Sequence, residues 1–115
     1  MVFGVMANFY INAITSLSAT TSTSIYTVPS GSSAIVKTVS VYNSNASNSA
    51  ALTVQVTDTS ASATKTFDKA TVGAETKKAF LQNGEVMVLD ENDILKMTAG
   101  TANYFDVFVS VMEVS

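Results

Sequence analysis

The sequence predicts an all-β protein: a single β-sandwich, jelly-roll or Ig-like, with about eight to nine short antiparallel strands and an N-terminal arm. β-Branched and aromatic residues recur in short runs, and clusters of Gly, Asn, Ser and Asp separate these runs. A length of 115 residues leaves room for one domain and one core. We therefore expect an arm or first strand over residues 1–12 and the sandwich over residues 13–115.

The first half of the chain is expected to hold four strands, at 9–17, 25–28, 34–42 and 52–57. Pro29 follows the second of these and Gly31 comes two residues later, which predicts a turn. The Asn- and Ser-rich stretch 43–50 is expected to be a loop within the domain, because strong strands flank it. From position 52 apolar residues alternate with Thr and Gln, as in a strand with one solvated face.

The second half is expected to hold five more strands, at 64–68, 77–81, 85–89, 94–98 and 105–112. Asn83 and Gly84 form a dipeptide typical of a two-residue hairpin turn. The polar run 90–93 predicts a further reversal. Lys77 and Lys78 fit a solvated strand edge, where lysine discourages wrong pairing.

The last strand has two faces of different character. Every second residue from Phe105 to Val111 is apolar and predicts a core face. The opposite face carries Phe108 and Met112 among polar residues. This strand is therefore either central with its second face covered, or it exposes that face to another subunit.

The composition is unusual for a free-standing soluble monomer. Hydrophobic residues make up 47% of the chain and charged residues only 13%, against about 25% in a typical domain. Ser, Thr and Asn supply the missing polarity, as in the stretch 18–24. Such a surface suits burial against copies of the chain or a larger assembly, and the alternative is a secreted or extracellular domain with a Ser/Thr-rich exterior.

The charges and the N-terminus exclude several partners. The net charge is −3 and all six basic residues are Lys, so the side chain that most often reads phosphate and guanine is missing and no nucleic-acid partner is expected. The apolar N-terminus lacks a basic n-region and is too short to span a bilayer, so neither export nor a membrane partner is expected. Its apolar side chains need a partner surface. The candidate interface residues are Phe3, Val5, Phe9, Tyr10, Ile11, Phe108 and Met112.

The inventory of reactive side chains argues against an enzyme. With no His and no Cys, the usual nucleophile–base pairs and thiolate metal sites cannot be built. No glycine-rich phosphate loop is present, so no cofactor is expected. The run 90–93 offers oxygen ligands for Ca²⁺, but stabilisation of its own turn by side chains is the stronger interpretation.

Two sugar-directed alternatives remain open. Carboxylate pairs hydrolyse glycosides, but nothing in the sequence selects a pair among Glu85, Asp90, Asp93 and Asp106. A lectin-like module would hold host glycans through loop Tyr, Asn and Asp side chains, with Asn43, Asn45 and Asn48 as the testable positions.

Several segments of the sequence have features of a known group of proteins. Residues 25–43 carry a Tyr-Thr-Val-Pro turn with Gly31, leading into a strand that ends at Asn43, and residues 84–89 and 93–97 look like an acid-containing hairpin. These features resemble small virion proteins of tailed bacteriophages over about residues 15–114. The resemblance implies a capsid decoration (cement) protein on the capsid surface, or a tail, neck or fibre-associated subunit. It also implies a homo-oligomer, with a trimer favoured, and contacts with the major capsid protein or other virion proteins.

Overall fold

The computed structural model describes residues 8–82 and 84–115, and in these residues the chain is all β, with nine strands in two sheets and no helix. One sheet, sheet A, contains β1 (Asn8–Ser16), β9 (Phe105–Val114), β3 (Ser33–Asn43), β6 (Lys77–Ala79) and β7 (Met87–Leu89). The other, sheet B, contains β2 (Thr23–Thr27), β8 (Ile94–Ala99), β4 (Ala50–Asp58) and β5 (Ala63–Val72). The described part contains no helix that could cross a membrane.

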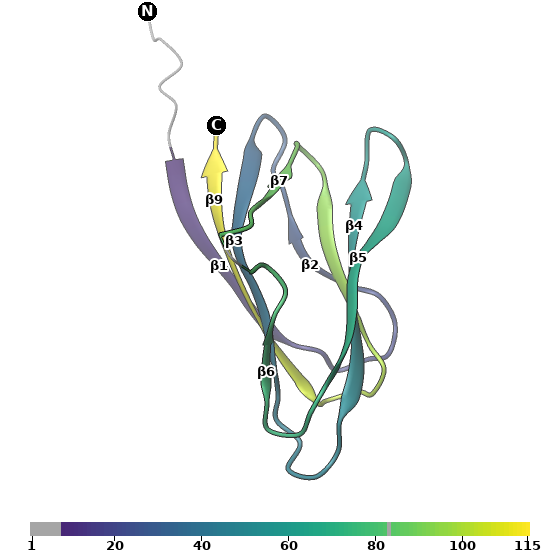
Figure 1. Ribbon diagram of the computed structural model, residues 1–115. Coiled ribbons are helices and arrows are strands. Elements are labelled where there is room, and N and C mark those ends of the chain that lie inside the picture. The colour runs from purple at the N-terminus through teal and green to yellow at the C-terminus, as the bar shows by residue number, and fades with distance from the viewer. Residues whose placement is uncertain (1–7, 83) are drawn as a thin grey trace, which may run out of the picture.

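The strand order is that of a jelly roll. Sheet A runs β1-β9-β3 and then β6, with β7 also paired to β3, and sheet B runs β2-β8-β4-β5. Most connections cross from one sheet to the other, so sequence neighbours lie in opposite layers (Figure 1). All pairings are antiparallel. The predicted all-β sandwich is therefore confirmed.

The core lies between the two sheets. Every second residue of β9 from Phe105 to Val111 is buried, which confirms the predicted core face of this strand. The same cluster takes in residues of the other layer, including Leu52 and Val54 of β4 and Leu95 of β8. Since β9 lies between β1 and β3, it is a central strand of its sheet.

The predicted hairpin at Asn83 and Gly84 is wrong. β6 and β7 both pair antiparallel with β3, at Ser40–Tyr42 and Ala34–Val36 respectively. Two strands that are each antiparallel to a third run in the same direction, so they cannot form a hairpin with each other. They lie end to end along one edge of β3 (Figure 1). Gly84 still adopts a turn conformation, with φ +78, but Asn83 lies outside the described residues.

The other two predicted turns are present. The Ser32 amide donates to the Pro29 carbonyl over 3.2 Å, and Gly31 between them has φ +81, a value that glycine adopts without strain. The Asp93 amide donates to the Asp90 carbonyl over 3.1 Å. This second turn joins β7 of one sheet to β8 of the other.

Strand β1 runs without interruption from Asn8 to Ser16 and pairs with β9 along its whole length. The expected boundary between residues 12 and 13 falls inside this strand. The start of β1 and the end of β9 lie at the same end of the sandwich, because Asn8 is the partner of Val114 (Figure 1).

Candidate interaction surface

The outer face of sheet A carries apolar side chains in cross-strand rows. Tyr10 of β1 lies opposite Met112 of β9, Met112 lies opposite Ile35 of β3, and Ile35 lies opposite Val88 of β7. In a second row, Ile14 lies opposite Phe108. We call the set of Tyr10, Ile14, Ile35, Val88, Phe108 and Met112 the outer patch.

Four members of the outer patch are strongly exposed. The exposed fraction is 79% for Tyr10, 66% for Val88, 63% for Ile14 and 40% for Phe108. The strands that carry them are held by the core on the opposite face, so the patch is presented by a rigid sheet. Because apolar surface grouped in this way is typical of interaction sites, the outer patch is the candidate interaction surface.

The outer face of sheet B has a different chemistry. Along its central strands Thr53 lies opposite Thr98 and Gln55 lies opposite Lys96, all only partly buried. Lys69 of β5 is the neighbour of Thr53 on the other side. Among the described residues, the apolar rows therefore lie on sheet A, whereas the central strands of sheet B are polar on the outside and Phe67 of β5 is its one exposed large apolar residue, at 38%.

The structure brings together three of the residues predicted to form an interface. Tyr10, Phe108 and Met112 all belong to the outer patch. Phe9 and Ile11 alternate with Tyr10 along β1 and so point to the opposite side of that strand. Phe3 and Val5 lie outside the described residues. The interface role of all these residues stays a prediction.

Three members of the outer patch were missed by the sequence analysis. Ile14 lies four residues after Tyr10 in β1 and therefore on the same face of the strand. This alternation could have been read from the sequence. Ile35 and Val88 reach the patch only because β3 pairs with both β9 and β7. That pairing is long-range information, which no local pattern contains.

One polar contact ties the two sheets together at the end where β9 finishes. The Tyr26 hydroxyl of β2 donates to Glu113 Oε2 of β9 over 2.5 Å. Burial raises the pKa of Tyr26 well above its ordinary value, and the hydrogen bond to the Glu113 carboxylate and its negative charge add to this shift. Tyr26 therefore stays neutral and acts as a donor between the sheets.

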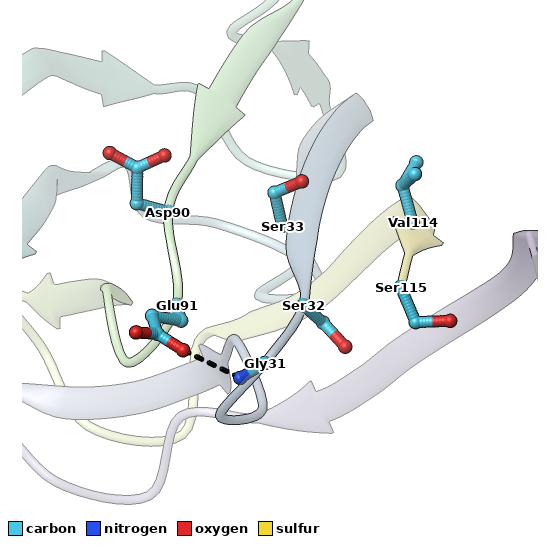
Figure 2. A pocket seen from close by; sticks show the side chains of 7 residues that line it. All are labelled: Gly31, Ser32, Ser33, Asp90, Glu91, Val114 and Ser115. Atoms are coloured by element: carbon cyan, nitrogen blue, oxygen red, sulfur yellow. Dashed lines mark hydrogen bonds between the residues drawn. The ribbon is translucent and has the colours of Figure 1, made fainter. Parts of the chain in front are cut away.

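In the acidic turn at residues 90–93, the carboxylates of Glu91 and Asp93 accept hydrogen bonds from backbone amides. Asp93 is 7% exposed, and its carboxylate accepts from the Asp90 amide over 3.0 Å and from the Thr59 amide over 3.3 Å. Glu91 Oε2 accepts from the Gly31 amide over 2.6 Å, beside an open polar depression at the end of β9 (Figure 2). These bonds confirm that the acidic side chains stabilise the turn. Within residues 8–82 and 84–115, no three His, Cys, Asp or Glu side chains are grouped as metal ligands.

The loop between β3 and β4 is organised by Asn43. This side chain is fully buried, and its Nδ2 donates to the carbonyls of Asn48 and Val72, each over 3.0 Å. Its Oδ1 accepts from the Asn45 amide over 2.9 Å, and Asn45 Oδ1 in turn accepts from the Ser47 and Asn48 amides. Asn43 therefore has no free polar atom to offer a glycan, and its role is structural.

Asp93 and Asp106, two of the carboxylates considered for glycoside hydrolysis, have separate hydrogen-bond partners among the described residues. Asp106 Oδ1 accepts from the Ser16 hydroxyl over 2.7 Å on sheet A, whereas Asp93 is bonded within its turn and to Thr59. In the described part of the chain, every buried side-chain nitrogen and oxygen has a hydrogen-bond partner. The polar groups of the interior are thus used to hold the fold.

Comparison with known proteins supports the fold and gives no family. No protein-family model matches the sequence, and no curated protein matches it. Among solved structures, the chain is similar to a chain of the disulfide-linked pili of Bacillus endospore appendages, with a TM-score of 0.57 and 9% identity over 98% of this chain and 92% of that chain. A weaker similarity is to the virus-like particle of the giant freshwater prawn Macrobrachium rosenbergii extra small virus, with a TM-score of 0.45 and 14% identity over 99% of this chain and 81% of that chain. The first similarity shows a fold shared along nearly the whole sandwich.

Proposed function

We propose that this protein is a virion structural subunit, a capsid decoration (cement) protein that binds the shell through the outer patch. The observation that carries the proposal is the contrast between the two outer faces. Sheet A presents exposed apolar side chains, and sheet B presents Thr, Gln and Lys. Subunit interfaces combine apolar anchors with polar residues, and the outer face of sheet A has this composition, because Asn12 and Ser110 lie between its two apolar rows.

Two further features support an assembled, non-enzymatic subunit. The fold is shared with a chain of a pilus, which is itself an assembly. The resemblance to phage virion proteins over about residues 15–114 supplies the proposed location on the capsid surface and the major capsid protein as partner. Because this sequence has no cysteine, its own contacts with neighbours do not include disulfide bonds.

The test is decoration of shells by the full chain and by two matched lysine variants. Phe108→Lys places a charge in the second row of the outer patch, opposite Ile14, and Thr71→Lys places the same charge on the exposed surface of sheet B. We expect Phe108→Lys to weaken binding by about 30-fold or more, because an aromatic anchor of the proposed interface is replaced by a charge. Thr71→Lys is expected to bind as the parent does. Equal binding by the parent and both variants would contradict the role of the patch.

Copy number in intact particles tests the location. A decoration protein is present in the high copy number of the shell, whereas a tail, neck or fibre subunit is present in the low copy number of the tail. Quantitative mass spectrometry of purified particles against the major capsid protein separates these cases. A tail-like copy number would overturn the cement role in favour of the second virion location.

A further inference from the structure

Strand β1 is an edge strand that lacks the usual protection against pairing. Among the described residues it is hydrogen-bonded to β9 on one side only. It is nine residues long, it contains no charged residue and no proline, and its pairing with β9 shows no bulge. Natural edge strands are normally shortened, charged or bulged to prevent association. β1 has none of these features.

The other sheet edges are protected. β5 carries Lys65 and Lys69, and its pairing with β4 shifts register at Val54. β2 has five residues and a register shift against β8. β6 and β7 have three residues each. Among the described strands, β1 is therefore the edge best suited to accept another strand.

We propose that β1 pairs antiparallel with β1 of a second copy, about a two-fold axis at Asn12. This contact rests on the proposed role as an assembled structural subunit. The outward-facing residues of β1 read Asn8, Tyr10, Asn12, Ile14 and Ser16. Read in reverse, this series has the same order of polar and apolar positions. Pairing about Asn12 places Tyr10 opposite Ile14 of the second copy and Asn8 opposite Ser16 of the second copy.

The register follows from this symmetry. Moving the axis by one residue to Ile11 places Tyr10 opposite Asn12, and moving it to Ala13 places Tyr10 opposite Ser16. Either shift sets the most exposed aromatic residue against a polar side chain. The axis at Asn12 instead forms two aromatic–β-branched pairs, each of a kind that stabilises a sheet by about 0.2 to 1 kcal/mol.

The pairing also joins two outer patches into one apolar surface. In each copy Tyr10 is flanked by Met112 and Ile14 is flanked by Phe108. Across the axis the row therefore runs Met112, Tyr10, then Ile14 and Phe108 of the second copy, and the symmetric row runs in the opposite sense. The joint carries no charge, so two chains of net charge −3 meet along neutral strands.

The test uses single cysteines, which are unique because the sequence has none. In the proposed register the two copies of residue 12 are about 5 Å apart, as directly opposed residues are. The two copies of residue 16 are about 27 Å apart, eight strand positions away. Both Asn12 and Ser16 are exposed, so Asn12→Cys and Ser16→Cys are matched variants that leave the core intact. Each full-length variant is treated with a short bismaleimide in solution.

We expect Asn12→Cys to form a covalent dimer and Ser16→Cys to remain monomeric on a denaturing gel. A mixture of Asn8→Cys and Ser16→Cys chains is expected to cross-link, while each alone does not. Cross-linking of Ser16→Cys as readily as Asn12→Cys, or of neither, overturns the proposed pairing. A trimer by light scattering without the Asn12→Cys product does the same. The assay needs no shell, so its result is independent of whether the protein decorates capsids.

Discussion

A single asparagine holds the loop between β3 and β4 in place. Asn43 is fully buried and uses both polar atoms of its side chain on backbone groups of three different residues, Asn45, Asn48 and Val72. A buried amide is stable in an apolar interior only when such partners are present. The buried Asn43 side chain therefore fixes the conformation of the loop between β3 and β4 through its hydrogen bonds.

Replacing Asn43 tests this interpretation. Asn43→Ala removes three hydrogen bonds, each worth about 1 kcal/mol net, so we expect the free energy of unfolding to fall by about 3 kcal/mol. The measurement is urea unfolding followed by circular dichroism. Asn48→Ala is the control, because the exposed Asn48 side chain makes one long bond to the Tyr104 hydroxyl and should change stability by about 0.5 kcal/mol or less. Equal losses in the two variants would show that burial of Asn43 is unimportant.

The Tyr26 to Glu113 contact predicts a dependence of stability on alkaline pH. The folded state raises the pKa of Tyr26 above the unfolded value of about 10, so the folded state holds the phenolic proton more tightly. This contribution is fully present below about pH 10 and is lost as the pH rises toward the folded pKa. Tyr26→Phe removes the titrating group and the hydrogen bond, and should cost about 1 to 3 kcal/mol at neutral pH.

The measurement compares the unfolding free energies of the parent and Tyr26→Phe between neutral pH and pH 11. The difference between them should shrink above about pH 10 as the parent loses this contribution. Tyr10→Phe is a matched control, since Tyr10 is 79% exposed. A constant difference across the whole range would contradict the proposed donor role of the Tyr26 hydroxyl.

At the level of single elements, strand β9 buries one face in the core and exposes the other face to solvent. One face carries Phe105 at 1% exposure, and the other carries Phe108 at 40% exposure. The two residues are of the same type and lie three positions apart in one strand. Strand alternation alone assigns one to the core and the other to the outer patch.

The two phenylalanines make a matched pair of truncations. Phe105→Ala should lower the free energy of unfolding by about 3 to 5 kcal/mol, because it leaves a cavity in the core. Phe108→Ala should cost about 1 kcal/mol, since much of its ring is already in water. Thermal and urea unfolding measure both. Phe108→Ala should instead weaken shell binding or self-association, and a variant with lost stability and intact assembly would reverse these assignments.

The nine strands could be predicted from local sequence, but their partners could not. The alternating apolar run from Phe105 to Val111 predicts a strand, and Pro29 with Gly31 predicts a turn. Both signals are local, and the structure confirms both features. The hairpin expected at Asn83 and Gly84 failed because β3 binds β6 and β7 separately, and this choice depends on contacts far apart in the sequence. Ile35 and Val88 were missed in the outer patch for the same reason.

At the scale of the whole molecule, the exposed apolar rows lie on sheet A, whereas the central strands of sheet B are polar on the outside. The low charge of the sequence, 13%, indicated a surface that neighbours cover. In the structure the outer patch lies on sheet A, and this is the surface that we propose neighbours cover. Of the residues predicted near the N-terminus, Tyr10 lies on the outer face of sheet A, whereas Phe9 and Ile11 lie on the other side of β1, and the interface role of all three stays a prediction.

Self-association along β1 should respond to salt as an uncharged contact does. High salt screens ion pairs but does not weaken apolar burial, and sulfate strengthens it. Sedimentation velocity at low and at high ionic strength should therefore show an unchanged or tighter dimer. A dimer that dissociates on addition of salt would indicate a contact between charged groups.

A charged version of the same joint is the control. In the double variant Tyr10→Lys, Ile14→Glu, the proposed register sets each introduced lysine opposite an introduced glutamate of the second copy. This variant should dimerise at low salt and dissociate at high salt. The variant with lysine at both positions should remain monomeric, because like charges then face each other.

The end-to-end arrangement of β6 and β7 limits how far such an assembly grows. A strand that joins sheet A at β1 extends the sheet on that side, while the far side of β3 is already filled by two short pieces joined by a turn. That far side offers no continuous strand on which a third copy can lie. The proposed two-fold contact uses the same edge of both copies and is therefore closed, so we expect a pair of sandwiches with their two outer patches side by side. A second open edge beyond β3 would allow further strands to add, and the three-residue strands β6 and β7 leave no long edge there.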